Sequence, residues 1–164
     1  MTHDKYDAGL SRNPANFTPL SPLTFLRRAA KVFPDNIAII HGDQRTSYRD
    51  FYRRCRQLGS ALEQAGIGKG DTVAIMSPNA PAMLEAHYGV PMTGAVLNTL
   101  NVRLDAATIA FTLDHGEAKV LLTDREFSQT IKEALVQAKS KPLVIDIDDA
   151  LAEGGDLIGK TDYE

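Results

Sequence analysis

The polar turn from Asn98 to Asp105 contains the residues best placed for chemistry in this sequence. A short apolar strand is expected before it, and a helix and a second apolar strand, Lys119 to Thr123, are expected after it. This order is typical of a parallel crossover, in which the turn at the carboxyl end of the first strand faces the binding crevice. The side chains that could contact a ligand there are Asn98, Thr99, Asn101 and Arg103.

The same turn also has a purely structural interpretation. Asn and Thr side chains commonly bond the local backbone, and Arg103 could simply pair with a carboxylate. We favour these structural roles over direct ligand contact. Ser77 and Asn79 follow the strand that ends at Met76, and either would be an ordinary cap for the next helix.

The glycine-rich run from Gly66 to Asp71 does not fit a phosphate loop. Walker A requires a glycine five residues before the Gly-Lys pair, where Glu63 stands, and Ser or Thr after the lysine, where Gly70 stands. The run also precedes a strand, whereas phosphate loops follow one and open a helix. A turn between a helix and a strand is expected here.

The histidines and the single cysteine show no metal-ligand spacing. His3 and His41 have no paired neighbour, whereas His87 is expected to be a partnered, partly buried ring on a helix. His115 could interact with the carboxyl end of its own helix. Cys55 falls on an apolar helical stripe and is expected to be an inert core thiol.

Asp146, Asp148 and Asp149 lie together near a strand end, where a solvated edge is the ordinary explanation. Neither a paired acid and base nor a nucleophile with its base is evident in this sequence.

Apolar strands begin near Thr72, Ala95, Lys119 and Leu143, with helical patterns between them. Parallel strands need crossovers of this size, so we expect an α/β fold: a mainly parallel sheet with helices on both faces. An N-terminal β-hairpin is expected before it, from the apolar run 37–40 and the segment 45–48. The expected helices cover residues 21–33, 48–65, 79–90, 105–115 and 125–139.

Residues at the ends of these segments predict where the helices stop and start. Ser21, Ser47 and Asp105 are candidate N-caps. Gly66 and Gly116 stand where a helix carboxyl end favours a left-handed residue.

Three parts of the chain are expected. Residues 1–20 are predicted to be a flexible arm, residues 21–147 an α/β subdomain, and residues 148–164 an acidic linker or truncated tail. The strand from Leu143 to Ile147 would then have an open edge, and exposed apolar surface would favour self-association into a homo-oligomer.

Composition excludes several classes of protein. The net charge of −3 argues against nucleic-acid binding, and Arg53, Arg54 and Arg56 are read as the solvated face of a helix. No apolar run is long enough to span a bilayer, and the first twenty residues lack an apolar signal core. One cysteine fits a reducing compartment, so the cytoplasm is the expected location.

Taken together, four segments resemble the beginning of the acyl-CoA synthetases, in the acyl-adenylate-forming (AMP-binding) superfamily. The resemblance covers residues 20–125 best and implies that the chain is a partial N-terminal domain of such an enzyme. No single piece is diagnostic, but the order and spacing of the pieces are jointly strong evidence. The segments are Thr46 to Phe51, Gly66 to Asn79, Gly94 to Leu104, and His115 to Val120.

The resemblance implies a two-step reaction, in which a carboxylic acid substrate and ATP form an acyl-adenylate and coenzyme A then displaces AMP. ATP, Mg²⁺ and coenzyme A would serve the full-length enzyme, none of them bound to this fragment. The phosphate loop and catalytic lysine of the family have no match in this sequence, so no catalytic residue is assigned and the fragment is expected to be inactive. Asn101, Val102 and Arg103 correspond in position to a border of the coenzyme A tunnel.

Two other interpretations remain open from the sequence. One is a self-sufficient α/β binding or interaction module such as a signalling receiver, although the strands ending at Ile40 and Met76 lack the acidic residues that receivers use for Mg²⁺. The other is an adenylating enzyme without the coenzyme A step, like luciferases or peptide adenylation domains. The remainder of the synthetase chain is the partner expected under the leading interpretation.

Overall fold

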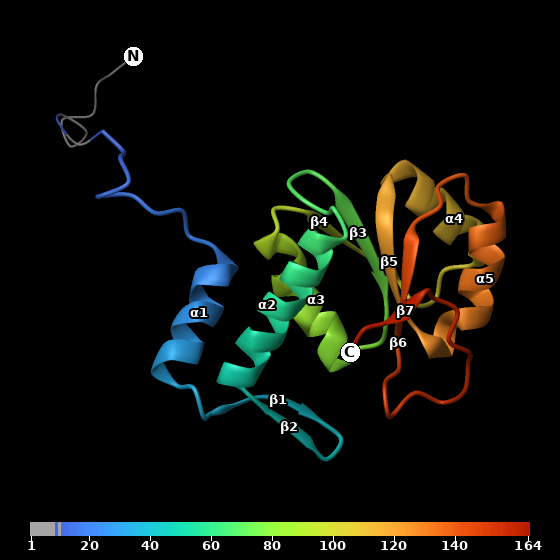
Figure 1. Cartoon of the computed structure of the whole chain (residues 1–164), viewed down its shortest axis with the longest axis horizontal. Helices are drawn as coiled ribbons and strands as arrows, with labels where there is room; N and C mark the ends of the chain where they lie inside the picture. The colour runs from blue at the N-terminus through green and yellow to red at the C-terminus, as the bar shows by residue number, and fades with distance from the viewer. Residues whose placement is uncertain (1–8, 10) are drawn as a thin grey trace.

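The computed structural model describes Gly9 and residues 11–164 (Figure 1). Of the arm expected over residues 1–20, residues 1–8 and 10, and His3 with them, lie outside the described residues. A pair of antiparallel strands and a parallel α/β unit follow α1. The elements are α1 (Pro22–Val32), β1 (Ile37–His41), β2 (Gln44–Ser47), α2 (Tyr48–Gln64), β3 (Thr72–Met76), α3 (Pro81–Met92), β4 (Val96–Thr99), α4 (Ala106–His115), β5 (Ala118–Asp124), η1 (Arg125–Phe127), α5 (Ser128–Gln137), β6 (Leu143–Ile147) and β7 (Thr161–Asp162).

The main sheet has the strand order β4-β3-β5-β6-β7, and every neighbouring pair is parallel. The central strands β3 and β5 are almost wholly buried, which fits strands covered on both faces. β1 and β2 form a separate antiparallel pair. The expected α/β class, parallel sheet and N-terminal hairpin are therefore confirmed.

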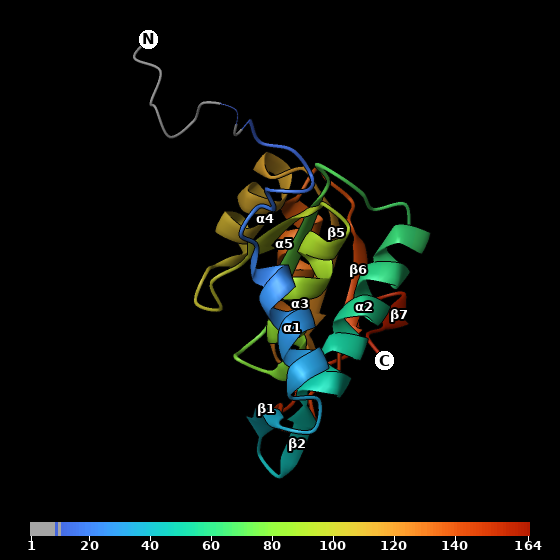
Figure 2. The ribbon, with the colours of Figure 1, turned by 90° about the vertical axis from the view of Figure 1, so that its left-hand side faces the viewer.

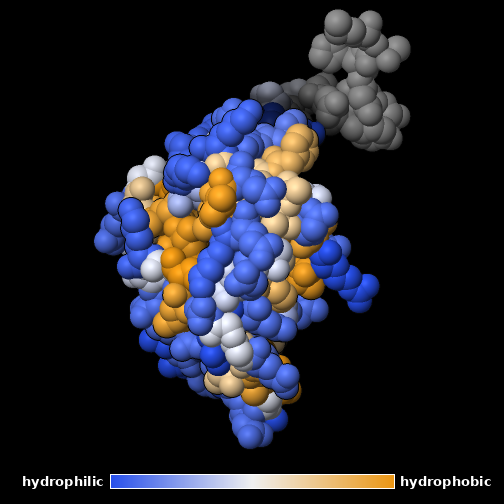
Figure 3. All heavy atoms as spheres, turned by 90° about the vertical axis from the view of Figure 1, so that its right-hand side faces the viewer, coloured by the Kyte–Doolittle hydropathy of each residue, from blue (hydrophilic) through white to orange (hydrophobic). Residues whose placement is uncertain are grey.

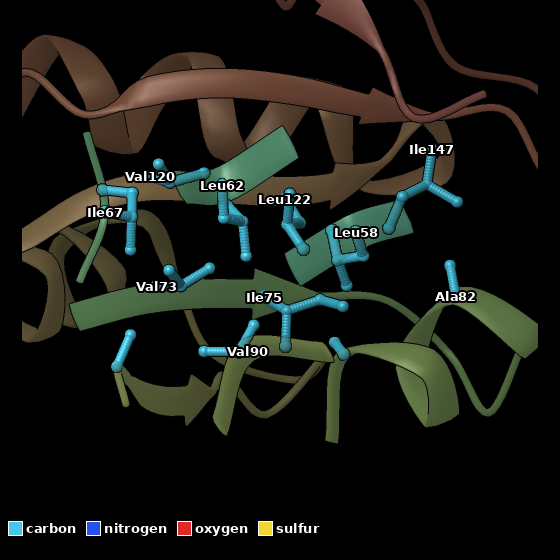
Figure 4. Close-up of a cluster of buried hydrophobic side chains, with 12 residues drawn as sticks. Leu58, Leu62, Ile67, Val73, Ile75, Ala82, Val90, Val120, Leu122 and Ile147 are labelled. Carbon is cyan, nitrogen blue, oxygen red and sulfur yellow. The ribbon is translucent and has the colours of Figure 1, made fainter. Parts of the chain in front are cut away.

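Helices α2 and α3 lie on one face of the sheet and α4 and α5 on the other (Figures 1 and 2), and an apolar core fills the space on each face. On one face, Leu58 and Leu62 of α2 point toward β3 and β5, and Val90 of α3 packs beside them (Figure 4). On the other face, Ile109 of α4 and Ile131 of α5 pack in the second core. Alternate strand residues supply both cores because side chains alternate across a strand.

A third apolar cluster joins α1 to α2 and contains Cys55. Leu26, Phe51 and Cys55 are buried together, and the Phe51 ring packs edge-on against Tyr88 with centroids 5.4 Å apart. Burial raises the pKa of the Cys55 thiol to about 12. The structure agrees with the prediction of an inert core thiol.

The predicted helix starts are mostly correct. Ser21, Ser47 and Asp105 each accept a backbone N–H of the following helix through their side chains. The cap expected from Ser77 or Asn79 is wrong, because α3 begins at Pro81 after Ala80, without a side-chain cap. Proline fits this first position because it needs no N–H partner there.

The predicted helix ends differ from each other. Gly66 has a φ of +82°, as expected for a residue that ends a helix in the left-handed conformation. Gly116 instead has a φ of −82°, and the next residue, Glu117, takes the positive φ of 50°. The prediction for Gly116 is therefore wrong by one position.

The end of the chain returns to the sheet. β7 pairs with β6 in parallel, through Ile145 with Thr161 and Asp146 with Asp162. A Cβ on Gly159 would lie 2.7 Å from the carbonyl oxygen of Val144, so glycine permits this close approach. The expected open edge on β6 is wrong, because β7 covers the carboxyl half of that strand.

Candidate functional site

The strand order predicts a ligand-binding crevice between β3 and β5, at the carboxyl ends of these strands. The chain leaves β3 toward α3 on one face of the sheet, and it leaves β5 toward α5 on the other. Ligands of open parallel sheets bind where the connections diverge in this way, outside the carboxyl ends of the strands. The residues at this point are Ser77 to Ala80 after β3 and Asp124 to Arg125 at the end of β5.

Asp124 is the most unusual side chain at this position. It is fully buried, and its Oδ1 accepts the backbone N–H of Glu126 at 3.0 Å. Its Oδ2 has no hydrogen-bond partner among the described residues. Burial raises the pKa of Asp124, and the neighbouring Asp149 adds to the rise.

The loop after β6 connects the carboxyl ends of the strands to the hairpin. Nε2 of His41, at the end of β1, lies 2.9 Å from both carboxylate oxygens of Asp149. Asp148 pairs with Nε of Arg125 at 2.7 Å. These contacts hold the hairpin, η1 and the β6 loop together at the carboxyl ends of the strands.

The prediction of a solvated acidic edge is wrong for Asp146. This residue is buried, its Oδ2 accepts the Gly159 N–H at 2.7 Å, and its Oδ1 has no partner among the described residues. The reason is the chain beyond residue 157, which folds over β6. No group of three His, Cys, Asp or Glu side chains in the described part of the chain is arranged to hold a metal ion.

A cavity of about 260 Å³ opens at the end of β3, between the hairpin and α3. Ile39 and Ile40 of β1 form one wall, and Met83 and Leu84 of α3 form the other. Asn79 and the two rings of His41 and His87 supply its polar side chains. The cavity is chiefly apolar and lies beside the crevice position.

The predicted turn from Asn98 to Arg103 lies one strand away from that crevice, because β4 is the edge strand. The Asn101 side chain accepts the N–H of Arg103 at 2.9 Å, which is the local structural role expected for asparagine. Asn101, Val102 and Arg103 are all exposed. The expected carboxylate partner of Arg103 is not found among the described residues.

The other candidates from the sequence have structural surroundings. Nδ1 of His87 donates to the carbonyl of Met83 at 2.8 Å, so the ring is partnered as predicted, but it is exposed and not partly buried. The His115 ring stacks on Phe111 with centroids 5.4 Å apart. His41 has the closest carboxylate contact of the described histidines.

The glycine-rich run lies at the opposite end of the strands and joins α2 to β3, as predicted. Asp71 accepts the Gly68 N–H at 2.9 Å and pairs with Nζ of Lys119 at 2.5 Å. Both contacts lower the pKa of Asp71, with Lys119 contributing most. The run is therefore a closed turn at the amino ends of the strands.

Sequence reasoning missed a buried ionic network around Glu85 of α3, which is only 1% exposed. Arg54 Nε donates to its Oε1 at 2.5 Å, and the Tyr163 hydroxyl donates to its Oε2 at 2.9 Å. Arg54 also donates through Nη2 to Glu164 at 2.6 Å. The interpretation of Arg54 as a solvated side chain is wrong, because residues 163–164 fold onto it.

Protonation in this network follows the contacts. Hydrogen bonding to Glu164 is the main cause that raises the pKa of Arg54, and Glu85 adds to it. Burial raises the pKa of Tyr163, and the Glu85 carboxylate raises it further. At neutral pH the network therefore holds a guanidinium cation and a protonated phenol as donors to Glu85.

Within the described residues, no helix combines the length and the apolar character that a membrane crossing requires.

Comparison with known proteins gives consistent matches. The family model described as AMP-binding enzyme matches residues 26–162. An acetate/butyrate–CoA ligase of Arabidopsis thaliana, described as peroxisomal, is 48% identical over 147 residues, which are 85% of this chain and 26% of that protein. An acetate–CoA ligase of Humulus lupulus is 50% identical over 126 residues, which are 77% of this chain and 22% of that protein.

Solved structures agree with these matches. A fatty acyl CoA synthetase of Mycobacterium tuberculosis superposes with a TM-score of 0.66 at 29% identity, over 73% of this chain and 24% of that chain. The chain thus spans only about a quarter of the length of the curated relatives it matches.

Proposed function

This chain belongs to the AMP-binding enzyme family, and from this premise we propose that it is the amino-terminal part of an ATP-dependent acyl-CoA ligase. In the first step a carboxylate would attack the α-phosphate of ATP, giving an acyl-adenylate and pyrophosphate. In the second step the thiol of coenzyme A would attack the acyl carbon and release AMP. Adenylation is needed because a free carboxylate is a poor acyl donor.

The observation that supports this proposal most is the joint match of the family model and of two acyl-CoA ligases across most of the chain. The expected acids are short aliphatic carboxylates, since the two relatives are named for acetate and butyrate. A role in fatty-acid metabolism follows from the same proposal.

In our proposal the described residues do not make a complete nucleotide or Mg²⁺ site of their own. They contain no three-ligand cluster for a metal, and the glycine-rich run is a closed turn. We therefore assign no step of the reaction to them. In our proposal they form the α/β layer on which the rest of the ligase builds the site for ATP and Mg²⁺.

Asn101, Val102 and Arg103 remain our proposed border of the coenzyme A tunnel. The Arg103 side chain is exposed, and guanidinium groups bind phosphates well through paired donors. The turn itself is fixed by Asn101 and by the Leu104 N–H, which donates to the Asn101 carbonyl at 3.1 Å. A fixed turn with an exposed cation suits contact with a phosphorylated ligand.

The test is pyrophosphate exchange with ATP, followed by detection of the thioester. Acetate, butyrate, octanoate and benzoate are supplied in turn to the complete polypeptide and to the 164-residue chain. We expect exchange and acyl-CoA formation by the complete polypeptide only. Exchange by the 164-residue chain would refute its role as a partial enzyme, and exchange without thioester would show an adenylating enzyme that does not use coenzyme A.

The cytoplasm remains the proposed location. The name of the Arabidopsis relative places that protein in the peroxisome, so cell fractionation of the complete protein is the deciding measurement.

A further inference from the structure

The groove with the largest volume among the cavities described here, about 610 Å³, lies between α2 and the strands β6 and β7. Its floor is apolar and includes Leu62 of α2 and Leu122, Leu143 and Ile145 of the sheet. Leu143 and Ile145 pack against the first core but remain only partly buried. Figure 3 shows the opposite side of the molecule, where α4 and α5 cover the sheet and apolar patches lie between hydrophilic side chains.

The groove is a gap in the helical layer of the sheet. On the opposite face, α4 and α5 pack against the strands, whereas on this face the helices are α2 and α3, which share a core with β3 and β5. Parallel sheets are normally covered by helices on both faces, because their strands are apolar on both sides. The face of β6 that looks into the groove therefore lacks its helix.

We propose that an amphipathic helix from the part of the ligase polypeptide beyond residue 164 docks in this groove. The proposal rests on the proposed function, since it requires that the complete protein be longer, as the curated relatives are. Tyr163 and Glu164 already form one wall of the groove, so the following residues would start beside it.

The charges at the rim define the chemistry of this helix. Arg53 lies on the α2 side and pairs with Asp50, and Asp162 and Glu164 lie on the β7 side, where Glu164 pairs with Arg54. A helix that presents an apolar stripe to the floor and a basic residue toward Asp162 would match these surfaces. The Glu85–Arg54–Tyr163 network fixes the wall against which this helix would pack.

The test uses a thiol placed in the groove. Ala61 is an exposed α2 residue that lines the groove, and Gln64 is an exposed residue of the same helix outside it. Ala61→Cys and Gln64→Cys are each made in the complete polypeptide and in the 164-residue chain, and maleimide labelling is followed by peptide mass spectrometry. The natural Cys55 is buried, with a thiol pKa of about 12, and gives little background.

We expect the thiol at position 61 to react at least about tenfold more slowly in the complete polypeptide than in the 164-residue chain, because the docked helix covers it. The thiol at position 64 should react equally fast in both proteins. Equal labelling at position 61 in both proteins would overturn the proposal. Protection of position 61 in the 164-residue chain that grows with its concentration would also overturn it, by showing that a second copy fills the groove.

The labelling result is independent of activity. Carboxylate-dependent pyrophosphate exchange on the same complete polypeptide separates the two proposals: exchange without protection of position 61 refutes the docked helix alone, and protection without exchange refutes the proposed function alone.

Discussion

The wall formed by α2, α3 and the end of the chain buries Glu85, whereas the carboxyl end of β5 buries Asp124. Both carboxylates are almost completely shielded from water, at 1% and 0% exposure. Each oxygen of Glu85 accepts a donor, from Arg54 and from Tyr163. Asp124 has one donor only, the N–H of Glu126, and its second oxygen has no partner among the described residues.

The different pairing of Glu85 and Asp124 indicates two different roles for a buried carboxylate. A paired carboxylate such as Glu85 fixes segments that are far apart in the sequence, and losing one partner leaves a charge buried alone. An incompletely paired carboxylate such as Asp124 already bears a desolvation cost, which a functional or packing partner could remove. The two sites should therefore respond in opposite directions when their charges are removed.

Arg54→Met should have the largest effect. It removes the cation beside Glu85 and should lower the free energy of unfolding of the chain by about 3 kcal/mol, the usual cost of breaking a buried pair from one side. Chemical denaturation followed by circular dichroism measures this. Arg53→Met is the matched control on the same helix, because Arg53 forms an exposed pair with Asp50 and should cost less than about 1 kcal/mol. Equal effects of the two changes would contradict the network.

Tyr163→Phe should have the second largest effect. It removes the hydroxyl donor to Glu85 while keeping the packed ring, and a hydrogen bond to a charged group contributes about 1.5 to 3 kcal/mol. Hydrogen exchange should also speed up at Tyr163, whose N–H donates to the carbonyl of Asp146. Unchanged stability would show that the end of the chain is not held by Glu85.

The contrast between these regions also shows what the sequence can predict. Apolar periodicity predicted the strands and helices because alternation and helical spacing are local properties, and the caps at Ser47 and Asp105 are local too. The Glu85 network could not be predicted in this way, since Tyr163 is 78 residues from Glu85 and Glu164 is 110 residues from Arg54. The segment that precedes Tyr163 is rich in acidic residues and glycine, a composition that predicts a linker.

The candidate site was predicted less well than the fold. The spacing of the strands correctly predicted a turn at the carboxyl end of β4. Spacing along the sequence does not show which strands are neighbours in the sheet. β4 is an edge strand, so the divergence of connections falls between β3 and β5, next to Asp124. Asp124 stands at the end of an apolar strand, directly before Arg125. A charged residue at that position was the sequence feature that could have identified this site.

Glu85→Gln should have a smaller effect than loss of either donor. An amide in place of the carboxylate retains one acceptor oxygen, and Arg54 keeps its contact with Glu164, so we expect a loss of about 1 kcal/mol. In the double variant Arg54→Met/Glu85→Gln, no buried charge is left unpaired, and the loss should be smaller than the sum of the two single losses. Strict additivity in this cycle would show that the two side chains do not interact.

Asp124→Asn should have the smallest effect and the opposite sign. The asparagine can still accept the Glu126 N–H, and a neutral amide costs less to bury than a carboxylate, so the chain should gain about 0.5 kcal/mol at pH 7. Because burial raises the pKa of Asp124 in the folded state, the wild-type chain binds this proton more tightly when folded. Its stability contribution is present at low pH and is lost as the pH rises from the ordinary carboxyl range, about pH 4, through the raised value.

The variant lacks this group, so its advantage over the wild type should grow between about pH 4 and pH 7 and vanish in more acidic solution. Denaturation series at several pH values measure the difference directly. Glu126→Gln is the control, since it removes a nearby exposed carboxylate but leaves Asp124 and its backbone donor in place. A loss of stability in Asp124→Asn at pH 7 would mean that the second oxygen of Asp124 has a donor after all, and the contrast with Glu85 would no longer hold.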